Sequence, residues 1–137
     1  MSIFPVYTSS QNSSHFSSQN TNIIFFSCIA PQIARRCAAF DMNILYHKRT
    51  PLADNPYNLR LTYAPLDELL RRSDFVVIIV PLTEETTGLI GRAQLAKMKN
   101  SAVLVNVSRG PVVDTEALTE ALQGGIQTSW KFDYKCY

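Results

Sequence analysis

The sequence has 137 residues, a formal net charge of +2 and 46% hydrophobic residues, which is typical of one soluble domain with a single core. The small charge and the lack of a basic cluster with interleaved aromatics argue against a nucleic-acid-binding protein. The longest apolar run, residues 75–81, is too short to span a bilayer. We therefore expect a cytoplasmic protein with no membrane and no nucleic-acid partner. Its cysteines, Cys28, Cys37 and Cys136, lack metal-ligand spacing, which indicates reduced thiols and no metal site.

Composition divides the chain unevenly. Residues 1–22 are rich in Ser, Asn, Gln and Thr and have no apolar periodicity, which predicts a flexible tail. Residues 23–128 carry the apolar patterns and are expected to form a partial dinucleotide-binding domain. Residues 129–137 are expected to be an unrelated C-terminal tail.

The elements alternate from residue 23 onward. Residues 23–29 have strand character, and Pro31 suits the first turn of a helix over 31–40. Residues 43–47 predict the next strand, and a polar loop with Pro51 and Pro56 leads to a short helix at 66–72. Residues 74–80 are continuously apolar, which is typical of a strand buried on both faces of a parallel sheet.

The pattern continues to residue 125. An amphipathic helix is expected at 91–99, a second buried strand at 102–107, and a helix at 114–125 with Asp114 as its N-cap and a glycine pair as its stop. The alternation predicts an α/β protein with a partial Rossmann-like, doubly wound parallel sheet. Ligands of such sheets bind outside the carboxyl ends of the strands. Those ends are residues 27–30, 47–50, 81–83 and 107–110.

Arg109 stands where an apolar strand stops. Its guanidinium can grip a carboxylate in a two-pronged geometry that lysine does not reproduce. Gly110 and Pro111 would form a tight turn that points the arginine into the crevice. An arginine that pairs with a helix carboxylate at the sheet edge explains the position equally well.

The second strand ends in basic residues. In dinucleotide folds an acidic residue at this place receives the ribose 2′-hydroxyl, whereas basic residues accommodate a 2′-phosphate. His47, Lys48 and Arg49 include no acid, so NADP(H) is favoured over NAD(H). A solvated basic turn is the alternative. After the third strand, Thr83 could approach a cofactor, or with Glu85 or Thr86 could begin the next helix.

Three long stretches carry a family resemblance: residues 33–49, 66–90 and 95–125, the last including "NVSRGPVVD". Together they resemble the cofactor-binding domain of the D-isomer-specific 2-hydroxyacid dehydrogenases, and within it the bacterial glyoxylate/hydroxypyruvate (2-ketogluconate) reductases. The resemblance covers residues 23–127. It implies that Arg109 binds the substrate carboxylate and polarises the keto group. It implies cofactor contacts at Cys28 and Ile29 (pyrophosphate), His47, Lys48, Arg49 and Thr50 (2′-phosphate), Pro81, and Val107 and Ser108 (nicotinamide).

The chain also departs from the family pattern. The family reads Gly-x-Gly-Arg-Ile-Gly before the first helix, and here Phe25, Ser27 and Ala30 stand at the glycine positions. Phe25 resists backbone conformations that glycine takes freely, so we expect weakened cofactor affinity. In the family, the general acid–base His and the Glu that orients it lie in segments further along the chain. The last residues of this chain, "TSWKFDYKCY", do not match those segments. Neither His15 nor His47 can replace that histidine.

We therefore expect an NAD(P)-dependent oxidoreductase fragment, truncated at both ends and without its substrate domain, that is inactive alone. In the intact family the substrate is a small 2-keto or 2-hydroxy acid such as glyoxylate or hydroxypyruvate. The alternative is a non-catalytic nucleotide-binding module or the remnant of a disrupted gene. A flavodoxin-like signalling domain shares the alternation but would need an acidic pocket at the first strand end. An exposed apolar sheet edge would favour self-association.

Overall fold

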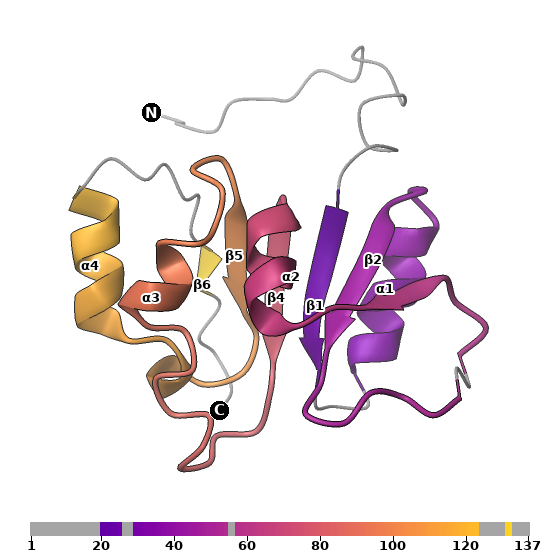
Figure 1. Cartoon of the computed structure of the whole chain (residues 1–137), viewed down its shortest axis with the longest axis horizontal. Helices are drawn as coiled ribbons and strands as arrows, with labels where there is room; N and C mark the ends of the chain where they lie inside the picture. Colours follow the sequence, from indigo (N-terminus) through magenta and orange to yellow (C-terminus); the bar gives the residue numbers. More distant parts are fainter. Residues whose placement is uncertain (1–19, 26–28, 55–56, 124–130, 133–137) are drawn as a thin grey trace, which may run out of the picture.

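The computed structural model of the chain describes residues 20–25, 29–54, 57–123 and 131–132. Its centre is a six-stranded parallel sheet with the strand order β3-β2-β1-β4-β5-β6 (Figure 1). This is the doubly wound order of dinucleotide-binding folds, so the predicted fold class is confirmed. The strands are β1 (Asn20–Phe25), β2 (Asn43–His47), β3 (Leu61–Tyr63), β4 (Phe75–Ile79), β5 (Val103–Asn106) and β6 (Lys131–Phe132).

Helices cover both faces of this sheet. Alternate residues of β4 point to opposite faces: Val76 and Ile78 belong to one core cluster, Val77 and Ile79 to the other. The first cluster packs under α2, α3 and α4, and the second packs under α1. Figure 1 shows α2 in front of the sheet. The helices are α1 (Ala30–Ala38), α2 (Leu66–Arg72), α3 (Arg92–Leu95), α4 (Thr115–Gln123) and the short 3-10 helix η1 (Gly110–Val112).

Two helix starts agree with the sequence. Pro31 lies in the first turn of α1, where its missing N–H costs no hydrogen bond. The Asp114 carboxylate accepts hydrogen bonds from the backbone N–H groups of Glu116 and Ala117 at 3.0 and 3.1 Å, which makes it the predicted N-cap of α4. The glycine pair expected to stop α4 lies outside the described residues.

Other boundaries differ from the expectations. β1 begins at Asn20, three residues before the expected boundary between residues 22 and 23, and its polar first residues pair with β2 and β4. Lys131–Phe132, inside the segment expected to be a separate tail, pairs with β5. The helix expected at 91–99 is α-helical only over Arg92–Leu95. After Leu95 the helix becomes the tighter 3-10 type, because the N–H groups of Lys97 and Met98 donate to carbonyls three residues earlier in the chain.

β3 is an element that the sequence pattern missed. Leu61–Tyr63 lies in the stretch that was expected to be a polar loop, and it pairs in parallel with β2. The strand is short and none of its residues is fully buried, so it leaves no periodic signal.

In the part of the chain that the structure describes, no helix has the length and apolarity to cross a bilayer. The same residues contain no cluster of three or more His, Cys, Asp or Glu side chains that could hold a metal ion. A polar hollow of about 850 Å³ lies at the amino ends of β2 and β3, lined among others by Asn43, Asn58 and Arg60.

Candidate dinucleotide and carboxylate site

The carboxyl ends of the parallel strands lie together at the lower edge of the sheet in Figure 1. Most sequence-predicted site residues lie at or just after these ends: His47 ends β2 and Lys48 to Thr50 follow it, Pro81 comes after β4, and Val107 to Arg109 come after β5. Ile29 directly precedes α1. The fold therefore brings these residues to one edge, opposite the polar hollow. Cys28 and Ser27 lie outside the described residues.

The turn that carries Arg109 is fixed by Asn106. The Asn106 side chain, 7% exposed, accepts a hydrogen bond from the Ser108 N–H and donates one to the Arg109 carbonyl, both at 2.9 Å. The Arg109 guanidinium is exposed and donates to the Ser108 carbonyl at 2.9 Å. Among the described residues it forms no ion pair, so the helix-carboxylate alternative has no support there and the guanidinium remains available to a ligand.

Ser108 ties β5 to β4. Its hydroxyl donates to the Ile78 carbonyl and accepts from the Val80 N–H, each at 3.1 Å. These bonds engage the hydroxyl with the backbone, so Ser108 shapes the site rather than presenting a free polar group to it. Val107 beside it is 48% exposed and offers an apolar surface at the strand end.

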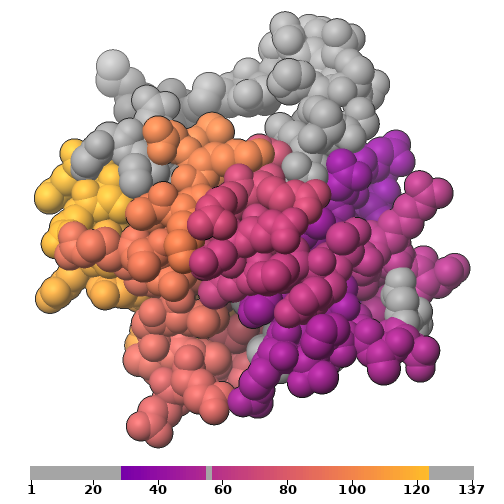
Figure 2. Space-filling model, viewed as in Figure 1, coloured from indigo at the N-terminus to yellow at the C-terminus, as the bar shows by residue number. Residues whose placement is uncertain are grey.

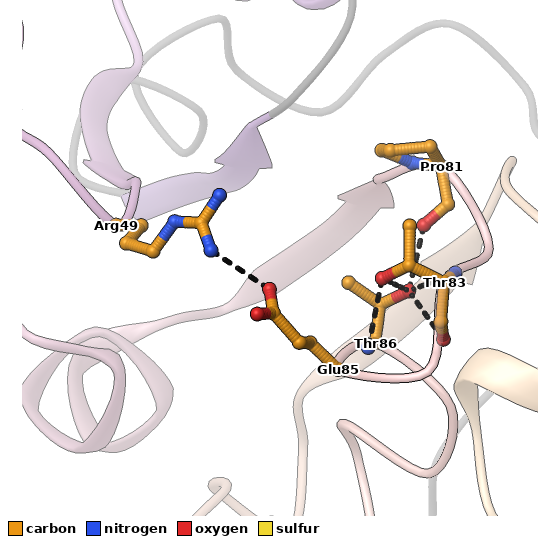
Figure 3. A network of polar contacts seen from close by, with 5 residues as sticks. All are labelled: Arg49, Pro81, Thr83, Glu85 and Thr86. Carbon is orange, nitrogen blue, oxygen red and sulfur yellow. Dashed lines mark hydrogen bonds and ion pairs between the residues drawn. The ribbon is translucent and has the colours of Figure 1, made fainter.

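The segment after β4 is a closed turn rather than the start of a helix (Figure 3). The Thr86 hydroxyl donates to the Pro81 carbonyl at 2.7 Å and accepts from the Thr83 N–H at 2.8 Å. Pro81 is exposed, and α3 begins only at Arg92. The expectation that Thr83 could begin the next helix is therefore wrong.

This turn is joined to the Arg109 turn. Gly88 N–H donates to the Pro111 carbonyl at 2.8 Å, and Ile90 N–H donates to the Val112 carbonyl at 3.1 Å. Ile90 and Val112 are fully buried. The loops after β4 and β5 therefore form one packed unit around the site.

At the end of β2, His47 faces β3. Its Nδ1 lies 3.1 Å from the Ala64 carbonyl, to which it donates, and its ring stacks on Tyr63 with centroids 6.1 Å apart. Lys48 is half-buried and Thr50 is exposed. His47 thus holds the basic turn against β3, a contact that could not be predicted while β3 was missed.

Arg49 reaches toward the β4 side of the edge. Its guanidinium lies 2.8 Å from the Glu85 carboxylate, and both side chains are 72% exposed (Figure 3). Figure 2 shows the segments after β2 and β4 close together at the lower edge of the molecule. No acid stands among residues 47–50 at the end of β2, but the fold brings Glu85 there from the loop after β4, two strands along the edge. The sequence pattern predicts for Glu85 only a place at the start of the next helix.

The first strand end shows how one lost glycine is tolerated. Ala30, at the third glycine position, is fully buried in the α1 core cluster, so α1 packs closely on the sheet with a methyl group in between. Ile29 is 55% exposed. Its carbonyl accepts from the N–H groups of Gln32 and Ile33, and α1 has no side-chain cap and no acid in its first turn.

Comparison with known proteins identifies relatives of this architecture. The family model described as "D-isomer specific 2-hydroxyacid dehydrogenase, NAD binding domain" matches residues 7–134, a longer stretch than the 23–127 of the sequence resemblance. A glyoxylate reductase of Thermococcus gammatolerans is 50% identical over 103 residues, which cover 75% of this chain and 31% of that protein.

Solved structures agree with this match. A glyoxylate reductase from Paecilomyes thermophila superimposes with a TM-score of 0.74 and 37% identity, over 82% of this chain and 34% of that one. The NAD-complexed D-isomer specific 2-hydroxyacid dehydrogenase of Lactobacillus delbrueckii ssp. bulgaricus gives a TM-score of 0.73 and 34% identity, over 81% and 34%. The chain thus spans about a third of the length of the relatives it matches.

Proposed function

The chain belongs to the D-isomer specific 2-hydroxyacid dehydrogenase family, in its NAD-binding domain, and from this premise we propose that it binds a nicotinamide dinucleotide along the carboxyl edge of its sheet. The observation that carries the proposal is the convergence of Arg49, Pro81, Val107 and Arg109 at that edge. We take residues 23–128, together with the paired residues of β1 and β6, as the binding unit, and the cytoplasm as its location.

The residues after β4 and β5 fit the nicotinamide end of such a ligand. Exposed Pro81 and Val107 offer apolar surface to a flat ring, and the polar backbone groups beside them are already satisfied by Ser108. The nicotinamide, when bound, supplies or accepts the hydride. Arg109 would hold the carboxylate of a small 2-keto acid, of the glyoxylate or hydroxypyruvate class, in a two-pronged contact.

The residues after β2 fit the adenosine end. Lys48 and Arg49 bring positive charge to the place where the ribose 2′-substituent lies in this fold, and Thr50 adds an exposed hydroxyl. This charge supports NADP(H) over NAD(H). Residues 26–28, at which the pyrophosphate would be bound, are outside the described part, so the fit rests on the two ends of the ligand.

Proton delivery decides between an enzyme and a binding module. His47 is the last residue of β2 and Arg109 follows β5, and these strands are three strand spacings apart in the sheet, or roughly 14 Å. The His47 Nδ1 also bonds to the Ala64 carbonyl, directly after β3. It is therefore too far to protonate a keto acid held by Arg109, and this supports the second candidate, a nucleotide-binding module without catalysis of its own. Reduction of a 2-keto acid would need an acid–base group beyond the described residues.

The experiment is calorimetric titration of the protein with NADPH and NADH, followed by glyoxylate-dependent NADPH oxidation. The proposal is supported if NADPH binds with a submillimolar dissociation constant and Arg49→Gln weakens this binding. Arg35→Gln, on the exposed side of α1, is the charge-matched control and should leave the binding unchanged. Binding without oxidation supports the module, and binding with oxidation that Arg109→Gln abolishes supports the enzyme. No binding of either dinucleotide overturns the proposal.

A further inference from the structure

The Arg49–Glu85 pair joins two loops at the carboxyl edge that carries the proposed site. Arg49 follows β2 and Glu85 belongs to the loop after β4, and β1 lies between these strands. Two strand spacings, roughly 10 Å, separate the strands that the pair connects. The 2.8 Å contact therefore joins the two sides of β1 at the carboxyl edge, where a dinucleotide crosses a doubly wound sheet.

The two partners are held differently. Glu85 sits on the turn that Thr83 and Thr86 close by side-chain and backbone hydrogen bonds (Figure 3), and this turn is bonded to the Arg109 turn through Gly88. Arg49 is a long side chain that is 72% exposed. Exposed ion pairs are weak, so a ligand with a higher negative charge can displace the Glu85 carboxylate from the Arg49 guanidinium.

We propose that Glu85 sets coenzyme selectivity by competing with the ribose 2′-substituent for Arg49, an inference that rests on the proposed dinucleotide site. A 2′-phosphate must displace Glu85 from Arg49 and is repelled by its carboxylate. A 2′-hydroxyl carries no such charge and can donate a hydrogen bond to Glu85. The acid from the β4 loop thereby reduces the preference for NADP(H) that the basic residues after β2 confer.

The test compares Glu85→Gln with the unmodified chain, using adenosine 2′,5′-bisphosphate and AMP as probes in calorimetry. These probes carry the adenosine end without the nicotinamide half. The dissociation constant for the bisphosphate should fall roughly two- to fivefold at low salt, while that for AMP changes less than about twofold, as expected for an exposed charge pair. The NADPH-to-NADH affinity ratio should rise by the same factor.

Two matched controls separate this effect from a general change of charge. Glu84→Gln alters the next carboxylate on the same loop, and Glu68→Gln removes the exposed Arg72–Glu68 pair on α2, which has a 2.7 Å contact. Neither should change the bisphosphate-to-AMP ratio. In an Arg49→Gln background, Glu85→Gln should lose most of its effect, because only the direct repulsion between the Glu85 carboxylate and the 2′-phosphate remains. Circular dichroism checks that each variant folds.

The outcomes distinguish this inference from the proposed function. If the dinucleotides and the bisphosphate bind but Glu85→Gln leaves the ratio unchanged, or Glu84→Gln raises it equally, the selectivity inference is overturned and the site stands. If neither dinucleotide nor either probe binds to any variant, the site itself is refuted and the inference falls with it.

Discussion

The Asn106 side-chain amide donates a hydrogen bond to the backbone carbonyl of Arg109 at 2.9 Å, and the amide is almost completely buried. Its oxygen accepts from the Ser108 N–H at the same distance. A buried polar group with both ends bonded to the next turn fixes that turn without a ligand. The position of Arg109 at the strand end is thus a property of the folded chain.

We expect Asn106→Ala to destabilise the protein. The change leaves the Ser108 N–H and the Arg109 carbonyl without their side-chain partner, which should lower the free energy of unfolding by about 1–3 kcal/mol. Urea denaturation followed by circular dichroism measures this. Asn100→Ala, at an exposed position, is the control and should change stability by less than about 0.5 kcal/mol. Equal effects at the two positions would contradict the role of Asn106.

Ser108→Ala should loosen the junction of β4 and β5. The Val80 N–H loses its acceptor and the Ile78 carbonyl loses one of its donors. The free energy of unfolding should therefore fall by about 1–2 kcal/mol. Hydrogen exchange at the Val80 amide should accelerate in Ser108→Ala and not in Ser101→Ala, whose serine is exposed. An unchanged Val80 exchange rate would show that the hydroxyl does not tie the strands.

Ala30→Gly should reduce stability although the family has glycine at this position. The Ala30 methyl is fully buried against the sheet, and removing one buried methyl costs about 1 kcal/mol. Thermal denaturation measures the change, with Ala39→Gly at the exposed C-cap of α1 as the control. A gain in stability would mean that the helix–sheet contact is strained by the methyl group.

Asp67 should make stability depend on pH. The hydrogen bond from Lys97, at 2.6 Å, lowers the pKa of the Asp67 carboxyl below its ordinary value of 3.8; burial opposes this shift, and the charges of Lys97 and Arg71 support it. A depressed folded-state pKa means that the unfolded chain binds the proton more tightly, so the pair stabilises the fold above the ordinary pKa and this stabilisation is lost as the pH falls through the folded pKa.

The corresponding variant is Asp67→Asn. It should be less stable than the unmodified chain near neutral pH, and the difference should shrink as the pH falls below about 4. Urea midpoints measured across that range test this. Glu68→Gln, which removes a neighbouring pair within α2, is the control. A difference that grows with acidification would contradict the assigned direction.

Much of the fold could be predicted because its signals are local. The bounds of β2 and α2 agree with the sequence pattern, since each element has an apolar face at its own period and a polar or proline boundary. The N-cap at Asp114 is likewise a contact between neighbours in the chain. β3 could not be found this way, because its three residues are held by pairing with β2 and carry no period of their own.

In the site, too, features with a local sequence signal could be predicted and contacts between distant loops could not. The strand-end positions of Arg49, Pro81 and Arg109 come from the alternation of elements alone. The Arg49–Glu85 pair depends on the order of the strands, which places two loops on either side of β1, and no spacing in the sequence records that order. Asn106 was a polar residue at the end of an apolar strand, a signal that could have indicated a buried side-chain bond to the following turn.

The most direct test of the dinucleotide site is a titration of the ¹⁵N-labelled protein with NADPH, followed by amide chemical shifts. We expect saturable shift changes at the carboxyl edge, at Ile29, Arg49, Val107 and Arg109, and none at the opposite hollow around Asn43 and Arg60. Changes confined to that hollow, or no change at millimolar NADPH, would contradict the account.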